Sequence, residues 1–242
     1  MNIPADAPLA IAVTEAIHKG DVPSLRRLLD ENPGLATARF VDSSGTSRSL
    51  FHVATDWPGH FPNGTMTVAA LIAGGADVNS RIIGPHTETP LHWAASCDDV
   101  PVLDALLDAG ADIEAPGAVI GDGTPLADAV AFGQWQAARR LVERGARTTL
   151  WQAAALGLKD RVEAFFASET SPSPTEISHA FWSACHGGKR IAAEYLLDRG
   201  ADLNLIPRWA NMTPLDIARQ EKADDLVAWL LSQGAKSAEE MR

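Results

Sequence analysis

One phrase recurs along this chain, a leucine-rich stretch that closes on Gly-Ala. It reads LIAGGADVN, LLDAGADIE, LVERGAR and LLDRGADLN, and the four copies end at Asn79, Glu114, Arg147 and Asn204. The Gly-Ala pairs begin at residues 75, 110, 145, 200 and 234, so three of the four intervals are 34 or 35 residues long. Such a period predicts an array of small structural repeats, each of which buries its apolar face only against its neighbours.

A second phrase precedes several copies of the first. It reads TPLHWAA from Thr89, TPLA from Thr124 and TPLD from Thr213. Together the two phrases resemble the ankyrin repeat, whose usual period is about 33 residues. In this pattern Thr caps the first of two helices, Pro suits its first turn, and Gly supplies a left-handed residue after the second helix.

The long interval between residues 145 and 200 hides a degenerate repeat, with helices expected at 150–157 and 160–167 and with 168–174 in place of the usual hairpin. A similar repeat opens the chain. The expected repeats one to seven span about 5–42, 45–80, 86–115, 121–148, 149–174, 175–206 and 210–236, followed by a polar tail at 237–242. We therefore expect one domain over 1–242. Its predicted fold is all-α, an ankyrin repeat solenoid of stacked helix pairs with short hairpin fingers and a concave palm lined by first helices.

Composition limits the partners and the compartment. The formal net charge is −11, and the basic pairs 26–27 and 139–140 fall on the solvated faces of second helices, so we expect no nucleic-acid partner. The chain has no run of 18 apolar residues and no secretory signal, so we expect no membrane partner and a cytoplasmic location. Cys97 and Cys185 lie three repeats apart, which predicts free thiols.

The side chains that line the palm follow from helix geometry. In the pattern TPLHxAAxxG, the residue after His and the residue four positions later share one helix face. From the first repeat to the seventh, these pairs are Glu15 and Lys19, Val53 and Trp57, Trp93 and Cys97, Asp128 and Phe132, Gln152 and Leu156, Trp182 and His186, and Ile217 and Glu221. Aromatic walls with a few polar groups are typical of small-ligand sites and of interface hot spots.

Two of these aromatic residues have a second interpretation. Trp93 and Trp182 sit where a large side chain can pack between adjacent repeats, so they are either core residues or palm contacts. Asp128 is harder to explain as a core residue, because a carboxylate at a half-buried position costs free energy unless it is paired or hydrated.

The seven histidines separate into two groups. His52 and His92 occupy the repeat's own His position and are expected to brace the local turn. The other five, which have no such reason for their positions, are His18, His60, His86, His179 and His186. His60 lies in an insertion at 56–64, where two Pro and two Gly predict a defined loop. His86 and Glu88 lie on the finger that enters the third repeat.

Distance decides which of these residues can act together. Adjacent first helices lie about 10 Å apart, so side chains from repeats two to four can surround one small molecule. The predicted binding site there consists of Asp56, Trp57, His60, His86, Glu88, Trp93 and Asp128. Trp182 and His186 are expected to form a second contact region.

The chemistry of this site is left open by the sequence. His beside carboxylates is the minimum for proton transfer, and Cys97 is a candidate nucleophile if His60 or His86 reaches it. No hydrolase, phosphate-loop, dinucleotide or zinc-protease signature accompanies these residues. A metal site built from Asp56, His60 and His86 is conceivable, but two loops without a recognised spacing would have to supply it. We therefore predict no metal and no cofactor.

Two functions remain open. The chain resembles compact, bacterial-type ankyrin repeat proteins, which implies a scaffold that binds a protein partner through palm and fingers, usually without catalysis. The insertion at 57–63, the missing hairpin and the Trp-rich palm depart from that pattern. They motivate the alternative of a small-molecule-binding protein or an enzyme, with an aromatic, acidic and His cleft in repeats two to four.

Overall fold

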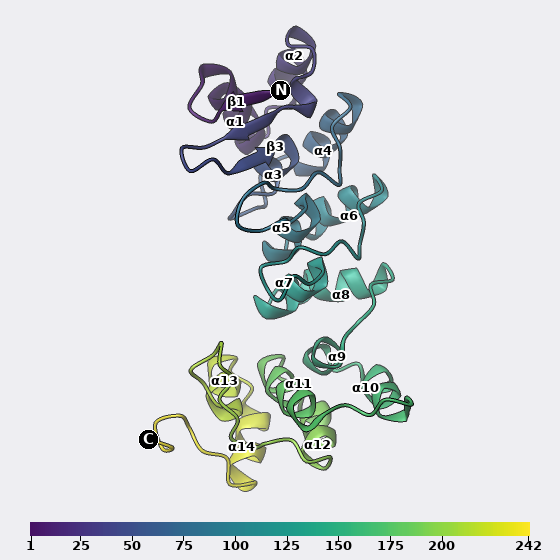
Figure 1. The fold of residues 1–242 in the computed structure, drawn as a ribbon, viewed down its shortest axis with the longest axis vertical. Coiled ribbons are helices and arrows are strands. Elements are labelled where there is room, and N and C mark those ends of the chain that lie inside the picture. The colour runs from purple at the N-terminus through teal and green to yellow at the C-terminus, as the bar shows by residue number, and fades with distance from the viewer. The chain divides into compact units, whose positions relative to one another are not determined.

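The computed structural model describes residues 1–242 and consists mainly of paired α-helices (Figure 1). The helices are α1 (Pro8–Lys19), α2 (Val22–Glu31), α3 (Leu50–Ala54), α4 (Gly64–Ala73), α5 (Pro90–Ser96), α6 (Val100–Asp108), α7 (Pro125–Ala131), α8 (Trp135–Glu143), α9 (Leu150–Leu156), α10 (Lys159–Ala167), α11 (Pro174–His186), α12 (Arg190–Leu197), α13 (Pro214–Gln220) and α14 (Asp224–Ser232). In chain order they form seven pairs, and each expected repeat holds one pair, with α11 starting one residue before its repeat.

Local chemistry explains where these helices begin and end. Thr213 caps α13 by accepting a hydrogen bond from the backbone N–H of Asp216, and Ser173 caps α11 in the same way through Glu176. The glycines of the five Gly-Ala pairs all have positive φ, between 85° and 101°. A side chain at these positions would be strained, which is why glycine recurs there.

A small sheet accompanies the helices of the first two repeats. Strand β1 (Asn2–Pro4) pairs in parallel with β2 (Arg39–Val41), which pairs antiparallel with β3 (Ser47–Ser49). A single 3₁₀ turn, η1 (Leu35–Thr37), precedes β2. The β2–β3 hairpin forms the first finger, and a bridge from Ser47 to Ile83 ties the next finger to it.

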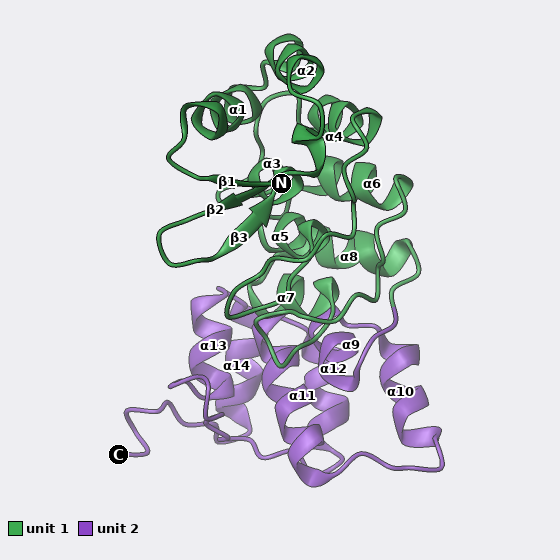
Figure 2. Ribbon diagram, turned by 45° about the horizontal axis from the view of Figure 1, so that its top comes forward, with its two compact units in different colours: residues 1–146 green, residues 147–242 purple.

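The chain divides into two compact units, which we call unit 1 (Met1–Ala146) and unit 2 (Arg147–Arg242) (Figure 2). Unit 1 contains α1 to α8 and unit 2 contains α9 to α14. In each unit the core lies between stacked helices and is built largely from alanine and leucine, with Phe51 in unit 1 and Phe181 in unit 2 fully buried. That the whole chain is one domain stays a prediction.

The insertion of the second repeat is a loop, as its composition predicted. No helix covers residues 55–63, the Trp57–Pro58 peptide is cis, and both His60 and Asn63 have positive φ. In unit 2, α11 has 13 residues where α5, α7 and α13 have 7 each. No helix of the structure is both long and apolar enough to cross a bilayer.

Candidate functional site

The two template histidines brace the local turn, as predicted, and they also brace the junction with the next repeat. Nε2 of His52 lies 3.1 Å from the carbonyl oxygen of Glu88, and Nδ1 lies 2.8 Å from Oγ of Ser49. Because a carbonyl only accepts, Nε2 carries the proton and Nδ1 accepts from the Ser49 hydroxyl. His92 repeats this arrangement with Thr89 and with the carbonyl of Gly123. Burial lowers the pKa of His52 to about 3 and that of His92 to about 4, so both rings are neutral.

Trp182 occupies the same position in the sixth repeat. Its Nε1 donates to the carbonyl of Met212 at 3.0 Å, and Met212 precedes the helix cap Thr213 just as Glu88 precedes Thr89. The predicted palm position of Trp182 takes Gly187 as the final Gly of the pattern TPLHxAAxxG. The glycine with positive φ is Gly188, so Trp182 stands at the His position of the pattern. With 8% of its surface exposed, Trp182 fits the core interpretation.

Gln152 was also predicted on the palm, and the structure corrects this. Its Oε1 accepts a hydrogen bond from the backbone N–H of Thr149 at 2.8 Å, which closes the capping box of α9. The side chain is 4% exposed and faces the helix start. The left-handed Gly157 lies eight residues after the cap Thr149, whereas Gly133 lies nine residues after the cap Thr124. Counting back from the glycine therefore placed Gln152 one position too far along the pattern.

Glu88, Trp93 and Asp128 come together in unit 1, as predicted. Nε1 of Trp93 donates to Oε2 of Glu88 at 3.1 Å, and the indole meets His52 edge-on at 5.0 Å. Asp128 has no exposed surface, and neither of its carboxyl oxygens accepts a hydrogen bond from a protein donor. The finger residue Glu88 therefore faces a first-helix carboxyl that has no cation beside it.

A proton on one of the two carboxyls, Glu88 and Asp128, removes the repulsion between them. Burial, followed by the charge of Glu88, raises the pKa of Asp128 from its ordinary value of 3.8 to about 8, although the backbone N–H of Ile120 acts in the opposite direction. Two adjacent buried carboxyls cannot both ionise without a large cost. At neutral pH Asp128 is the protonated member, and its O–H can donate to Glu88.

The rest of the predicted constellation does not converge. Asp56 forms an ion pair with Arg48 at 2.6 Å, and the backbone N–H of His60 donates to Asp99 at 2.8 Å. Nε2 of His60 lies 2.9 Å from the carbonyl oxygen of Cys97, so the loop is fastened to the third repeat. His86 is exposed on its finger. No group of three or more His, Cys, Asp or Glu side chains is arranged to hold a metal ion.

Cys97 lacks the environment of a nucleophile. Burial raises the pKa of its thiol to about 11, and the nearby carboxylates of Asp99 and Asp56 act in the same direction. Its Sγ contacts the carbonyl of Thr55 at 3.8 Å. Because His60 bonds the backbone of Cys97, it does not act as a base toward the sulfur.

In unit 2 an aromatic cluster surrounds Trp182. His186 lies 5.6 Å from the Trp182 ring centroid, and its Nε2 is 3.8 Å from Oε1 of Glu221. Burial lowers the pKa of His186, while Glu221 acts in the opposite direction. Trp209, which the repeat pattern did not single out, is 63% exposed and meets His179 at 4.6 Å.

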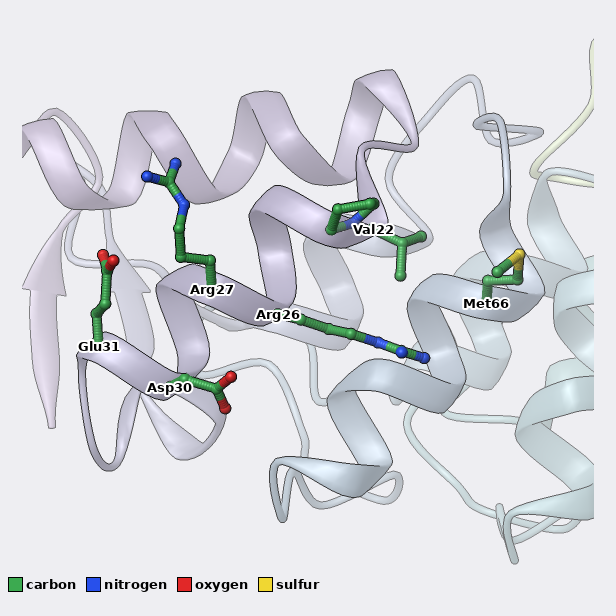
Figure 3. A pocket seen from close by; sticks show the side chains of 7 residues that line it. Val22, Arg26, Arg27, Asp30, Glu31 and Met66 are labelled. Atoms are coloured by element: carbon green, nitrogen blue, oxygen red, sulfur yellow. The ribbon is translucent and has the colours of Figure 1, made fainter.

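A pocket of about 690 Å³ lies elsewhere, between α2 and α4 (Figure 3). Its lining residues are Val22, Pro23, Arg26, Arg27, Asp30, Glu31 and Met66. Figure 3 shows Arg26 extending toward α4, while Arg27 and Glu31 leave α2 in other directions. This pocket is lined by second helices and contains no residue of the predicted aromatic and acidic site.

Comparisons with known proteins agree with the helix-pair architecture. The family model described as "Ankyrin repeats (3 copies)" matches residues 62–151. A curated relative, "Ankyrin repeat and KH domain-containing protein CBG24701" from Caenorhabditis briggsae, is 31% identical over 186 residues, which are 73% of this chain and 7% of that protein. The human ASB11 ankyrin repeat domain matches with a TM-score of 0.52 and 20% identity, covering 93% of this chain and 97% of that one. At this identity the structural likeness concerns the fold alone.

Proposed function

Since this chain is an ankyrin repeat protein with an all-α solenoid fold, we propose that it binds a protein partner through the palm of unit 1. Ankyrin repeats are generally scaffolds for protein–protein interaction. The predicted bacterial origin has no support from the relative found, which is a nematode protein of which this chain spans a small part.

The observation that carries the proposal is the exposure of two palm aromatics. Trp57, in the loop after α3, is 82% exposed, and Phe132, the C-cap of α7, is 50% exposed; the repeat spacing predicted both on the palm. Cys97 occupies the same stripe in the repeat between them. Large aromatic side chains left in water on one face are typical of surfaces that become buried in a complex.

The alternative, a small-molecule site or enzyme in repeats two to four, has no comparable support. Its proposed reactive groups have other partners, since His60 bonds the Cys97 backbone and Asp56 pairs with Arg48. We also propose that the protein is cytoplasmic and binds no nucleic acid. Two free cysteines and a net charge of −11 support this.

Selection from a random linear-peptide library displayed on phage tests the proposal, with the full chain as bait. Recovered peptides should lose at least about tenfold in affinity when the chain carries Trp57→Ala or Phe132→Ala, as expected for exposed aromatic anchors. Trp209→Ala is the matched control, because it removes another largely exposed Trp, from unit 2. Peptides that bind both palm variants as tightly as the parent would overturn the proposal.

A further inference from the structure

We infer that the partner segment places a basic side chain at the Glu88 carboxylate, and that Asp128 is a buried acid that positions this carboxylate. The inference rests on the proposed function and specifies the chemistry of the partner. It follows from three observations: the missing cation at Glu88, the orphaned oxygens of Asp128, and the charge of unit 1.

Glu88 is a carboxylate without a counter-charge. The residue is 8% exposed, accepts one hydrogen bond from Trp93, and belongs to none of the ion pairs of the structure. A carboxylate so far removed from water is stabilised by an incoming cation, because a charge-assisted hydrogen bond replaces the solvation that it has lost. The neighbouring rings of His52 and His92 are neutral and do not supply this charge.

Asp128 positions the carboxylate of Glu88. Apart from the nearby backbone N–H of Ile120, no donor faces the Asp128 oxygens, and the carboxyl of Asp128 lies beside that of Glu88. As a neutral acid it donates one hydrogen bond to Glu88, while the Trp93 indole donates another. Two fixed donors hold the Glu88 carboxylate in one orientation.

The surroundings of Glu88 favour a basic side chain in particular. Trp93 offers a ring beside the carboxylate, and the exposed Trp57 and Phe132 belong to the repeats on either side. A lysine or arginine stem packs on aromatic surface while its charged end reaches the carboxylate. Unit 1 holds 18 acidic and 9 basic residues, whereas unit 2 holds 13 and 11, so the field of unit 1 attracts a basic segment more strongly.

The same peptide selection tests this inference on the full chain. Recovered peptides should be enriched in Arg or Lys relative to the unselected library. Replacing the conserved basic residue of one such peptide by citrulline, an uncharged isostere of arginine, should weaken binding to the parent protein by about tenfold or more. This measurement does not depend on how any protein variant folds.

Protein variants then separate the two carboxyls. Glu88→Gln should lose about as much affinity as the citrulline peptide does. Asp128→Asn should stay within about threefold of the parent, because its amide donates the hydrogen bond that the protonated acid donates. Glu15→Gln, which alters an exposed acid of the palm stripe in repeat one, is the matched control and should have little effect.

The outcomes distinguish this inference from the proposed function. Peptides that require Trp57 and Phe132 but show no basic enrichment would overturn the inference and leave the proposed function standing. Equal binding of the arginine and citrulline peptides would do the same. A loss with Asp128→Asn as large as with Glu88→Gln would overturn the positioning role, since the charge of Asp128 would then be the anchor.

Discussion

Replacing Asp128 by Asn should make the stability of unit 1 less dependent on pH. The folded protein raises the pKa of this carboxyl from 3.8 to about 8, so the folded state binds the proton more tightly than the unfolded state does. The contribution of the protonated acid is complete below the unfolded pKa and is lost as the pH rises through the folded pKa. Between these limits the loss is about 1.4 kcal/mol per pH unit.

The magnitude follows from that slope. Asp128→Asn cannot ionise, so the free energy of unfolding of the variant minus that of the parent should grow by about 3 kcal/mol between roughly pH 5.5 and pH 7.5. Asp128→Ala removes the same slope but leaves Glu88 with the Trp93 indole as its one donor, so it should be less stable than Asp128→Asn by about 1 to 2 kcal/mol.

Hydrogen exchange of the amides in α7 and α5 measures this difference locally. Local measurement is needed because an array with two compact units need not unfold in one step. The pKa values of the buried His52 and His92 are lowered from 6.5. These two residues therefore reduce the free energy of unfolding as the pH falls below 6.5, which is the opposite pH dependence. Subtracting the parent curve removes that contribution. Asp30→Asn, at an exposed acid of α2, controls for the loss of one charge.

Parallel pH curves for the parent and Asp128→Asn would refute this reasoning. They would show that Asp128 ionises at its ordinary pKa, which requires a donor or water beside it, and Glu88 would then lose its positioning partner.

Four further predictions concern the braced junctions, the thiols and the secondary structure. His92→Ala should lower the free energy of unfolding by about 2 kcal/mol or more, because it leaves the Thr89 N–H unpaired and opens a cavity in the core; denaturant titration measures this. Trp182→His should cost less than Trp182→Ala in the same titration, since imidazole also offers an N–H to the carbonyl of Met212. Cys185 is fully buried and burial raises the pKa of its thiol, so a thiol reagent followed by mass spectrometry should modify Cys97 slowly in the folded protein and Cys185 only after unfolding; a Cys97–Cys185 disulfide would contradict the repeat arrangement. Circular dichroism should show a mainly helical spectrum with little sheet.

The sequence predicted those parts of the fold that depend on neighbouring residues. Helix caps, left-handed glycines and the roles of His52 and His92 each follow from a few adjacent positions, and the structure confirms them. The small sheet was not predicted, because strands of three residues such as β1 carry no usable alternation pattern.

The palm was harder to predict than the helices. The palm positions were counted from the glycine after each first helix, and a shift of one residue in that glycine moves the assigned side chain by about 100° around the axis, which misplaced Gln152 and Trp182. The meeting of Glu88 and Asp128 was predicted from the repeat spacing. Their shared proton was not, because it depends on burial that only the packed structure shows.

The braced junctions also give the array a direction. His52 reaches the carbonyl before α5, His92 the carbonyl before α7, and Trp182 the carbonyl before α13, so each ring reaches toward the C-terminus. A repeat therefore needs its successor to complete its own hydrogen bonds, whereas it completes those of its predecessor. During synthesis, such a ring has no acceptor until the following repeat emerges. Removing repeat seven likewise takes away the acceptor of the Trp182 indole N–H, which water then has to replace.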